Sequence, residues 1–334
     1  MLWTVWVEGG SFQTAGGTFN IPSLPGLGAP YAPFSNLPGL EGAFGFDYRW
    51  APDSPWHFVF DFRYGRNRTA TSSSSTSSST GPTTTTTTTH STHVISPYTS
   101  VLQAIVRSTT NSGSSSSATQ ASDWESHWVA DFMIGRDLGM GSSSPQIQLG
   151  IRVADLSIAG SATESGLTTS TVTKGTTTTR TKSVYGTFYT PTVTTKGPTT
   201  VATAIASSSS ASWNSCFFGA GPRAAFTGSQ PIVGFWTFDY GTGIALLFGE
   251  RCFKASGVAA GGSFSLTSNS YAAVVNNDGW AALSYWFTPH AKLSAGIRAD
   301  FYASALTTYN INTGALETID RAYWGPFVRL TAVF

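Results

Sequence analysis

The residues whose spacing could form a metal or acid–base site are His90 and His93, which stand three positions apart. They lie in a Ser/Thr tract without a nearby carboxylate, so a metal ligand set or a catalytic base would lack its partners. The glycine-rich stretch 257–262 lacks the strand and helix that frame a phosphate-binding loop. The sequence therefore predicts no enzyme, no metal site and no cofactor.

Cys216 and Cys252 are too few for a disulfide-dense scaffold or a metal cluster. They are either two unrelated small apolar residues or one disulfide near the mouth of a hairpin, and the disulfide requires an oxidising compartment. The chain begins without a positively charged stretch and an apolar core. We therefore expect that a secretory signal peptide is absent from this sequence.

Composition limits the class of protein. Charged residues make up 10% of the 334 residues and the net charge is +1, so the basic surface that nucleic-acid binding requires is missing. A hydrophobic content of 40% is too high for a disordered chain, and 35 glycines with long Ser/Thr tracts do not suit a helical protein. No apolar stretch approaches the roughly 18 residues of a membrane-spanning helix. The chain is predicted to be all-β.

The elements that would position functional side chains are ten segments rich in aromatic and β-branched residues. They cover residues 2–12, 40–50, 56–66, 126–138, 146–158, 213–226, 235–253, 277–287, 292–304 and 321–334. Short connectors at 51–55, 141–145, 228–232 and 288–291 alternate with long polar ones at 13–38, 67–123, 160–212, 254–271 and 307–318. An outer membrane barrel has this asymmetry, because its periplasmic turns are tight and its extracellular loops are long.

We therefore expect one outer membrane domain over residues 1–334, a transmembrane antiparallel up-and-down β-barrel of about ten strands. Residues 67–123 and 160–212 would be Ser/Thr-rich flexible extracellular loops, because their composition cannot bury enough apolar surface to offset chain entropy. Within the second loop, residues 184–193 could form a short hairpin. An even strand number would place both termini at one end of the barrel.

The segments 40–50 and 56–66 show how the two faces differ. In both, aromatic residues share one parity and charged residues share the other. A turn centred on Asp53 would pair Phe46 with Phe60 and Phe44 with Phe62. An arginine or lysine facing lipid at mid-depth costs about 2–4 kcal/mol, so the aromatic face is predicted to meet lipid. A soluble sheet packed on a core is the alternative for this hairpin, but other segments repeat the division.

Inward positions of the segments carry most of the charge. The predicted lumen lining is Glu41, Asp47, Arg49, Asp61, Arg63, Asp131, Arg152, Arg223, Asp239, Arg298, Asp300 and Arg329, with Glu8 and Arg321 on the same face. Ten strands would enclose a narrow lumen, in which tight places require paired charges and wet places set a mild anion preference. The predicted aromatic girdle at the membrane surfaces is Trp50, Trp56, Tyr64, Trp324 and Phe334.

Some residues fit a barrel strand less well. Pro222 and Pro326 lie inside segments, where each should mark a bulge or a missing ladder bond. Trp280 and Trp286 fall on the inward parity of their segment, so the strand count could differ by two.

Three short stretches resemble a known family. The stretches Trp3–Gly10, Gly219–Arg223 followed by Leu247–Gly249, and Tyr323–Thr331 are similar to the Legionella-type pore-forming major outer membrane proteins. The similarity covers barrel segments and none of the Ser/Thr-rich connectors. It implies a pore in the outer membrane of a Gram-negative bacterium and brings no catalytic residues. The final segment ends in Phe334, as in the signal that the barrel assembly machinery reads.

Two functions remain open from the sequence. The first is a porin-like pore for small solutes or ions, with outer membrane lipid and the assembly machinery as partners and the loops facing the cell exterior. The alternative is a non-conducting surface barrel that acts as an adhesin or anchor through its Ser/Thr-rich loops. A surface enzyme would need acids and histidines clustered at the outer rim, and the sequence does not indicate such a cluster. Nothing in the sequence fixes the oligomeric state.

Overall fold

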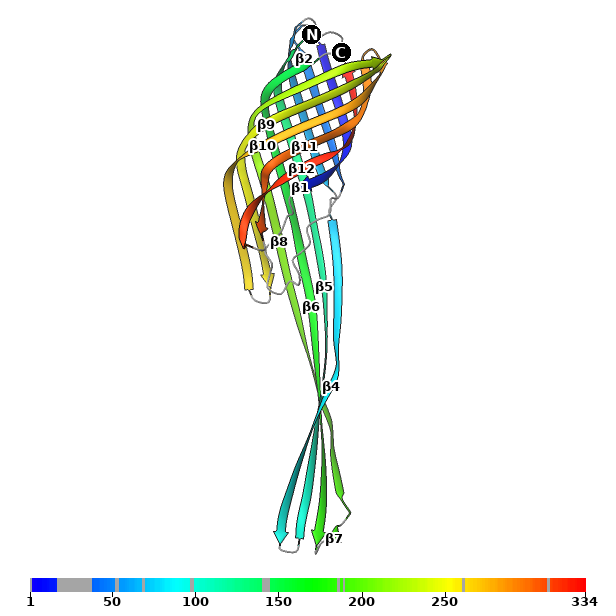
Figure 1. Ribbon diagram of the computed structural model, residues 1–334, viewed down its shortest axis with the longest axis vertical. Helices are drawn as coiled ribbons and strands as arrows, with labels where there is room; N and C mark the ends of the chain where they lie inside the picture. Colours follow the sequence, from blue (N-terminus) through cyan, green and yellow to red (C-terminus); the bar gives the residue numbers. More distant parts are fainter. Residues whose placement is uncertain are drawn as a thin grey trace. The chain divides into compact units, whose positions relative to one another are not determined.

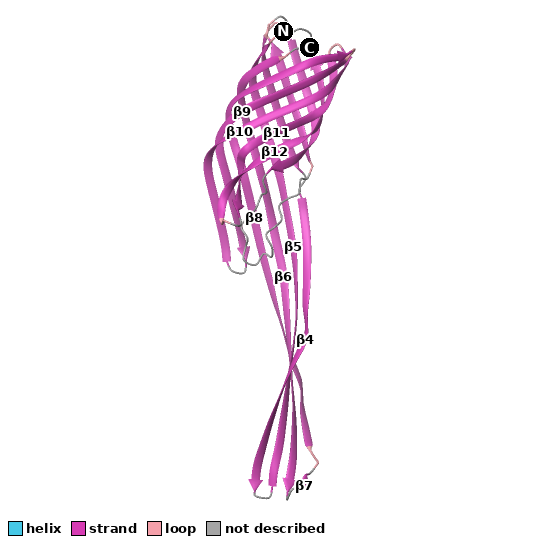
Figure 2. Cartoon of the chain, viewed as in Figure 1, coloured by secondary structure: helices cyan, strands magenta, loops and turns pink. Residues whose placement is uncertain are grey.

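The computed structural model describes residues 2–16, 38–51, 54–67, 70–96, 99–139, 145–184, 187–188, 190–259, 262–310 and 313–334. Regular structure in these ranges is entirely β-strand (Figure 2), and none of these residues forms a helix long and apolar enough to cross a membrane. The chain divides into two compact units. Unit 1 comprises Met1–Ser72, Gln120–Thr163 and Ser209–Phe334, and unit 2 comprises Ser73–Thr119 and Glu164–Ser208. The expectation of a single domain over 1–334 differs from this organisation.

Unit 1 is a closed antiparallel barrel of ten strands (Figure 1), as the sequence predicted. In order around the ring these are β1 (Leu2–Gly16), β2 (Gly39–Arg49), β3 (Trp56–Asn67), β5 (Thr99–Asp137), β6 (Gln146–Val184), β8 (Thr192–Val233), β9 (Trp236–Ala259), β10 (Gly262–Thr288), β11 (Ala291–Asn310) and β12 (Ala315–Val333). The pairing of β5 with β6 and of β1 with β12 closes the ring. Strands β5, β6 and β8 contribute residues to both units.

Both chain termini lie at one end of the barrel, here called the terminal end (Figure 1). Trp3 and Phe334 exchange two backbone hydrogen bonds of 3.1 and 2.8 Å there. β8 and β9 turn at this end through Gly234, whose φ of +57° favours glycine in a tight hairpin turn. The predicted connector at 228–232 was wrong, because Ser229 and Pro231 still pair with β9. The opposite end of the barrel is called the distal end.

The β2–β3 hairpin has the predicted register. Phe46 lies opposite Phe60 and Phe44 lies opposite Phe62, with ring centroids 5.6 and 5.4 Å apart. Asp53, the expected centre of the turn, lies outside the described residues. Alternation of faces holds as well, since Phe44 is 51% exposed on the outside whereas Arg63 is 3% exposed on the inside.

Pro222 and Pro326 interrupt the strand ladders without a bulge. The β8–β9 pairing passes from Ala220↔Phe248 to Arg223↔Ala245, and the β1–β12 pairing passes from Gly10↔Phe327 to Gln13↔Trp324, each in unchanged register. Each proline lacks the N–H that a residue of a central strand would donate. Of the two expected outcomes, a bulge or a missing ladder bond, the structure therefore has the missing bond. Trp280 and Trp286 do point inward, and the ten-strand count stands.

Glycines on the barrel wall make room for inward-pointing rings. Gly135 of β5 lies opposite His57 of β3, and Gly65 of β3 lies opposite His127 of β5. A Cβ atom on Gly135 would lie 2.1 Å from Nε2 of His57, and one on Gly65 would lie 2.4 Å from Cε1 of His127. Both imidazoles therefore lie along the wall in space that only a neighbouring glycine leaves free.

The substitution Gly135→Ala is expected to lower the free energy of unfolding by about 1–3 kcal/mol, because the added methyl group overpacks a fixed ring. His57 is fully buried and its Nδ1 lies 2.9 Å from Asp47 Oδ2, so the ring has no free space to enter. Urea unfolding of the protein in lipid vesicles would measure the change. Gly9→Ala is the matched control, since a Cβ there meets nothing within 4 Å. Equal effects of the two substitutions would contradict this packing.

Unit 2 is built from strands of mostly Ser and Thr. It contains most of β4 (Ala70–Ser96) and parts of β5, β6 and β8, in the order β4–β5–β6–β8. The short β7 (Thr187–Phe188) pairs with the end of β6, within the stretch where a hairpin was considered. Hydroxyl groups hydrogen-bond across the strands, as between Thr76 and Ser117 at 2.8 Å and between Thr173 and Thr200 at 3.1 Å.

The expectation of loops over 67–123 and 160–212 was wrong for the described residues of these ranges, which lie mostly in strands. The connectors predicted at 254–271 and 307–318 are likewise mostly strand, since β9 and β10 extend to Ala259 and from Gly262. The composition argument counted only apolar burial. Threonine also favours extended backbone, and hydroxyl pairs across strands add stabilisation without a core.

Cys216 and Cys252 lie opposite each other on β8 and β9 and form a disulfide, with their Cα atoms 5.0 Å apart. The second of the two alternatives for these cysteines is therefore the observed one. The bond ties two neighbouring strands on the distal side of Arg223.

Candidate functional site

The barrel interior holds all twelve side chains of the predicted lining. Arg63, Asp131, Arg152, Arg223, Asp239 and Asp300 are each at most 9% exposed. The other six form polar contacts with inward side chains; they are Glu41, Asp47, Arg49, Asp61, Arg298 and Arg329. Glu8 and Arg321 also form ion pairs inside the barrel. Which residues face inward was thus predictable, and their role as a pore lining stays a prediction.

Arg152 of β6 is the centre of a buried ion network. Its Nε and Nη2 donate to Asp131 at 2.7 and 2.6 Å, and its Nη1 donates to Asp278 at 2.9 Å. Arg223 of β8 donates to the same Asp278 at 2.9 Å. A buried ion without a partner is strongly unfavourable, so these groups must neutralise one another. Asp278 was absent from the predicted lining, although it lies on the inward parity of β10.

Three ion pairs reach across the interior. Arg63 of β3 pairs with Asp300 of β11, and Arg152 of β6 lies 3.9 Å from the same carboxylate. Arg321 of β12 donates to Glu125 of β5, with Nε 2.6 Å from Oε1. In each pair the two strands are four apart around a ring of ten, and five is the largest separation that such a ring allows. These pairs bridge the interior between opposite parts of the wall.

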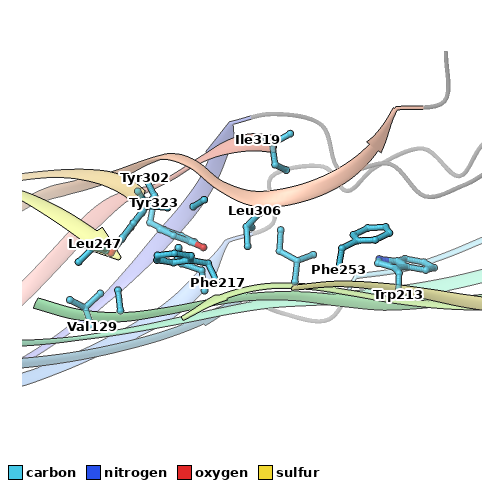
Figure 3. Close-up of a cluster of buried hydrophobic side chains, with 14 of the residues drawn as sticks. Val129, Trp213, Phe217, Leu247, Phe253, Tyr302, Leu306, Ile319 and Tyr323 are labelled. Carbon is cyan, nitrogen blue, oxygen red and sulfur yellow. The ribbon is translucent and has the colours of Figure 1, made fainter. Parts of the chain in front are cut away.

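On the distal side of the network the interior is filled by an apolar cluster, here called the apolar plug (Figure 3). It includes Phe12, Leu156, Phe217, Leu247, Phe253, Tyr302, Leu306, Ile319 and Tyr323, none more than 7% exposed. A water-filled path at this depth would leave these side chains accessible to solvent. Sequence reasoning missed the plug because it followed charges only, although Leu156 and Phe217 share the inward parity of Arg152 and Arg223.

Open space in unit 1 is divided. A cavity of about 460 Å³ at the terminal end, here called the terminal cavity, is lined by Arg49, Asp61, Trp280, Lys292 and Arg329 among others, with Arg152 and Asp131 also on its wall. A second cavity of about 560 Å³ is lined by residues such as Ser161, Ser210 and Phe264 and shares no lining residue with the first. A gap of about 10 Å³ beside Glu41 and Tyr323 has room for about one water molecule.

A group of acids and a histidine at the distal side was missed by sequence reasoning. Glu125 accepts a hydrogen bond of 2.8 Å from the Tyr323 hydroxyl in addition to its pair with Arg321, and His127 Nε2 lies 2.9 Å from Glu41 Oε2. Glu125 and His127 are each 2% exposed. They have the same parity as Asp131, so extending the strand by one further residue at its start would have found Glu125.

Asp123 is the next inward residue of β5 after Glu125, toward the distal end. Burial, with the negative charge of Glu125, raises the pKa of Asp123 to about 8, and the nearby Arg321 opposes the shift. Asp123 is 6% exposed, so few water molecules can solvate its charged form.

Asp123→Asn is expected to stabilise the protein at pH 8 and to have no effect at pH 4. The unfolded aspartate has a pKa of about 3.9, so the folded state binds the proton more tightly between about pH 4 and pH 8. Stability from this group is therefore complete below about pH 4 and is lost as the pH rises through about 8. Urea unfolding at pH 4, 6 and 8 would measure the difference. The exposed Glu250→Gln is the control, and the same pH profile for both variants would contradict the assignment.

The predicted girdle residues Trp50, Trp56, Tyr64, Trp324 and Phe334 are all exposed on the outside of the barrel. Between them, outward positions carry apolar side chains such as Phe132, Ile151, Ile244, Ile297 and Val328. This surface is called the apolar belt. Within the described residues, charge on the outward parity of β3, β5, β6 and β9 begins only at its margins, with Arg66, Arg136, Asp155 and Glu250.

Metal-ligating groups do not gather in the described part of the chain, where no cluster of three or more His, Cys, Asp and Glu side chains could hold an ion. His90 is an exposed residue of β4, and the side chain of His93 lies outside the described residues.

Comparison with known proteins finds no matching family model and no matching curated protein. Among solved structures, the outer membrane protease OmpT from Escherichia coli shares 10% identity at a TM-score of 0.34, covering 100% of this chain and 97% of its own. Neisserial surface protein A shares 9% identity at a TM-score of 0.28, with 98% and 95% covered. The translocator domain of the autotransporter NalP from Neisseria meningitidis shares 9% identity at 0.25, with 98% and 88% covered. The fold of this chain is assigned from its own strand pairing.

Proposed function

We propose that the chain is a non-conducting outer membrane barrel that anchors a Ser/Thr-rich β-structure at the cell surface. The membrane location is supported by the apolar belt. Exposed aromatic and aliphatic side chains cover the outside of the barrel while ion pairs fill its inside, the reverse of a water-soluble protein. The short turns and both termini would face the periplasm, and unit 2 would face the exterior.

The observation that carries the non-conducting assignment is the set of ion pairs between strands four apart, together with the apolar plug distal to them. Hydrated ions need a continuous polar path, and the described interior is closed by side chains with almost no exposed surface. The barrel then serves as an anchor, and the function resides in the Ser/Thr-rich strands.

Planar-bilayer recording of the wild-type protein tests this proposal. We expect no steady channel openings from protein that is folded, as judged by migration on a denaturing gel that shifts upon heating. Steady, reproducible conductance steps from such a preparation would contradict the assignment and favour a pore.

A narrow pore for small solutes is the second candidate, as the resemblance to the Legionella-type major outer membrane proteins implies. The terminal cavity favours it, since about 460 Å³ of space lined in part by charged side chains is already present in the barrel. Conduction would require displacement of the apolar plug and separation of Arg63 from Asp300. The predicted mild anion preference applies to that state only.

We propose no enzymatic activity. The acids and histidine near the distal side are buried against the apolar plug, with Glu125 and His127 each 2% exposed. A substrate would have no access to them in this arrangement. Lipid and the barrel assembly machinery, which would read the final strand ending in Phe334, are the proposed partners.

A further inference from the structure

We propose that the free edge of β4 is a homotypic docking site, at which β4 of one molecule pairs antiparallel with β4 of a second copy of this chain. This inference deepens the proposed display function and rests on it for the location of unit 2 outside the membrane. The strand is an edge because, among the described residues, β5 is its only neighbour in the sheet.

The length and exposure of β4 make this edge a template. It runs over 27 residues from Ala70 to Ser96. Every side chain described within it, from Ser73 to Thr92, is exposed. No element of the described structure covers its outer side. A long edge strand offers a row of unpaired N–H and C=O groups, which another extended strand satisfies by adding to the sheet.

Charge distinguishes β4 from the other strands of unit 2. Natural edge strands are protected by lysine, by proline or by other charged residues. The other free edge, residues 192–208 of β8, carries Lys196 and Pro198. β4 contains no Asp, Glu, Lys or Arg, and Pro82 is its only residue without an N–H donor. Each edge thus contains one proline, and the difference is the charge: the β8 edge is protected by a lysine, whereas the β4 edge has no charged residue.

The chemistry of the partner follows from the pairs already formed inside unit 2. Ser78 and Ser115 join β4 to β5 by hydroxyl groups 2.7 Å apart, and Thr84 and Thr110 join them by hydroxyl groups 2.9 Å apart. A strand rich in Ser and Thr thus pairs with another of the same kind. A second β4 offers this surface, and identical uncharged strands can pair about a twofold axis without like-charge repulsion.

The test uses the full chain in lipid nanodiscs with one barrel in each disc, examined by sedimentation velocity over a range of concentrations. Wild-type discs are expected to form pairs. The variant Thr83→Lys/Thr85→Lys/Thr87→Lys should weaken pairing at least tenfold, because it places three positive charges on the docking edge of each copy. The matched control is Thr199→Lys/Val201→Lys/Thr203→Lys on β8, which makes the same charge change and should pair like the wild type.

Two results would overturn the inference: wild-type discs that stay single at all concentrations, or equal loss of pairing in both triple variants. Heat-shifted gel migration of every sample establishes that its barrel is folded. Bilayer recording of the same samples separates this inference from the proposed function. Conducting discs that pair would defeat the non-conducting anchor alone, whereas silent discs that stay single would defeat the homotypic edge alone.

Discussion

Replacement of Arg152 by methionine is expected to lower the free energy of unfolding by about 3–5 kcal/mol, because removing one partner leaves buried charges uncompensated. Arg152 is fully buried, and its guanidinium serves Asp131, Asp278 and, at 3.9 Å, Asp300. Methionine is unbranched and occupies the space of the aliphatic part of the arginine side chain, so the loss reports mainly on the guanidinium. Urea unfolding in lipid vesicles would measure it, and the heat-shifted band should melt at lower temperature.

Lys254→Met is the matched control, because it removes a cation from an exposed position of β9 in the same unit. Its effect should stay within about 0.5 kcal/mol. Arg152→Met combined with Asp131→Asn should recover part of the loss, since the carboxylate that accepts two hydrogen bonds from Arg152 is then neutral. A single-variant effect below about 1 kcal/mol would show that water or ions replace the guanidinium, as they would in an open lumen.

The variant Ile297→Arg is expected to destabilise the protein by about 2–4 kcal/mol in lipid. Ile297 is 67% exposed in the middle of the apolar belt and pairs with Pro326 of β12. On a soluble protein an arginine at such an exposed site would change stability by no more than about 0.5 kcal/mol. The sign and size of the effect therefore distinguish a lipid-facing surface from a water-facing one.

Tyr271→Arg is the control for this experiment, because Tyr271 is 90% exposed on β10 opposite Glu250, beyond the margin of the apolar belt. Refolding both variants into vesicles and titrating with urea would compare them directly. If Ile297→Arg were as harmless as Tyr271→Arg, the belt would not be in contact with lipid.

The barrel strands and their faces could be predicted because side chains in a strand alternate with a period of two. Phe44 and Phe46 against Asp47 and Arg49 fix which face of β2 is outward, and a slip of one residue would reverse every side chain. The same rule recovers His127 and Lys292 once the strand limits are known. Register in the β2–β3 hairpin followed from the aromatic pairs for the same reason.

A narrow lumen with paired charges was predicted from the strand number, but the particular charges that pair across it could not be predicted in this way. The alternation of side chains along each strand predicts that Arg63 and Asp300 both face inward. The contact between them depends on the curvature and tilt of the ring, which bring β3 across from β11. The apolar plug was missed for a simpler reason. Phe217 and Leu306 occupy inward positions, and an apolar residue there is visible only if both faces of each strand are read for hydrophobicity.

The extended Ser/Thr strands were unexpected because low complexity normally indicates a chain without a core. Unit 2 has strands whose two faces are both polar, and its stabilisation comes from ladders and hydroxyl pairs such as Thr76 with Ser117. Backbone pairing of this kind leaves little signal in a hydrophobicity pattern, since no face differs from the other.

The strands of unit 2 have two similar polar faces, whereas the barrel strands of unit 1 have two different ones. This difference determines which changes in strand length each unit tolerates. Within the barrel, inserting one residue would turn arginines and aspartates toward lipid and phenylalanines toward the interior, so only even steps preserve the pattern. Along β4, where Thr83–Thr89 is a run of identical residues, one added threonine has no buried face to disturb. Simple expansion or contraction of the coding repeats could therefore lengthen or shorten the displayed strands while leaving the anchor intact.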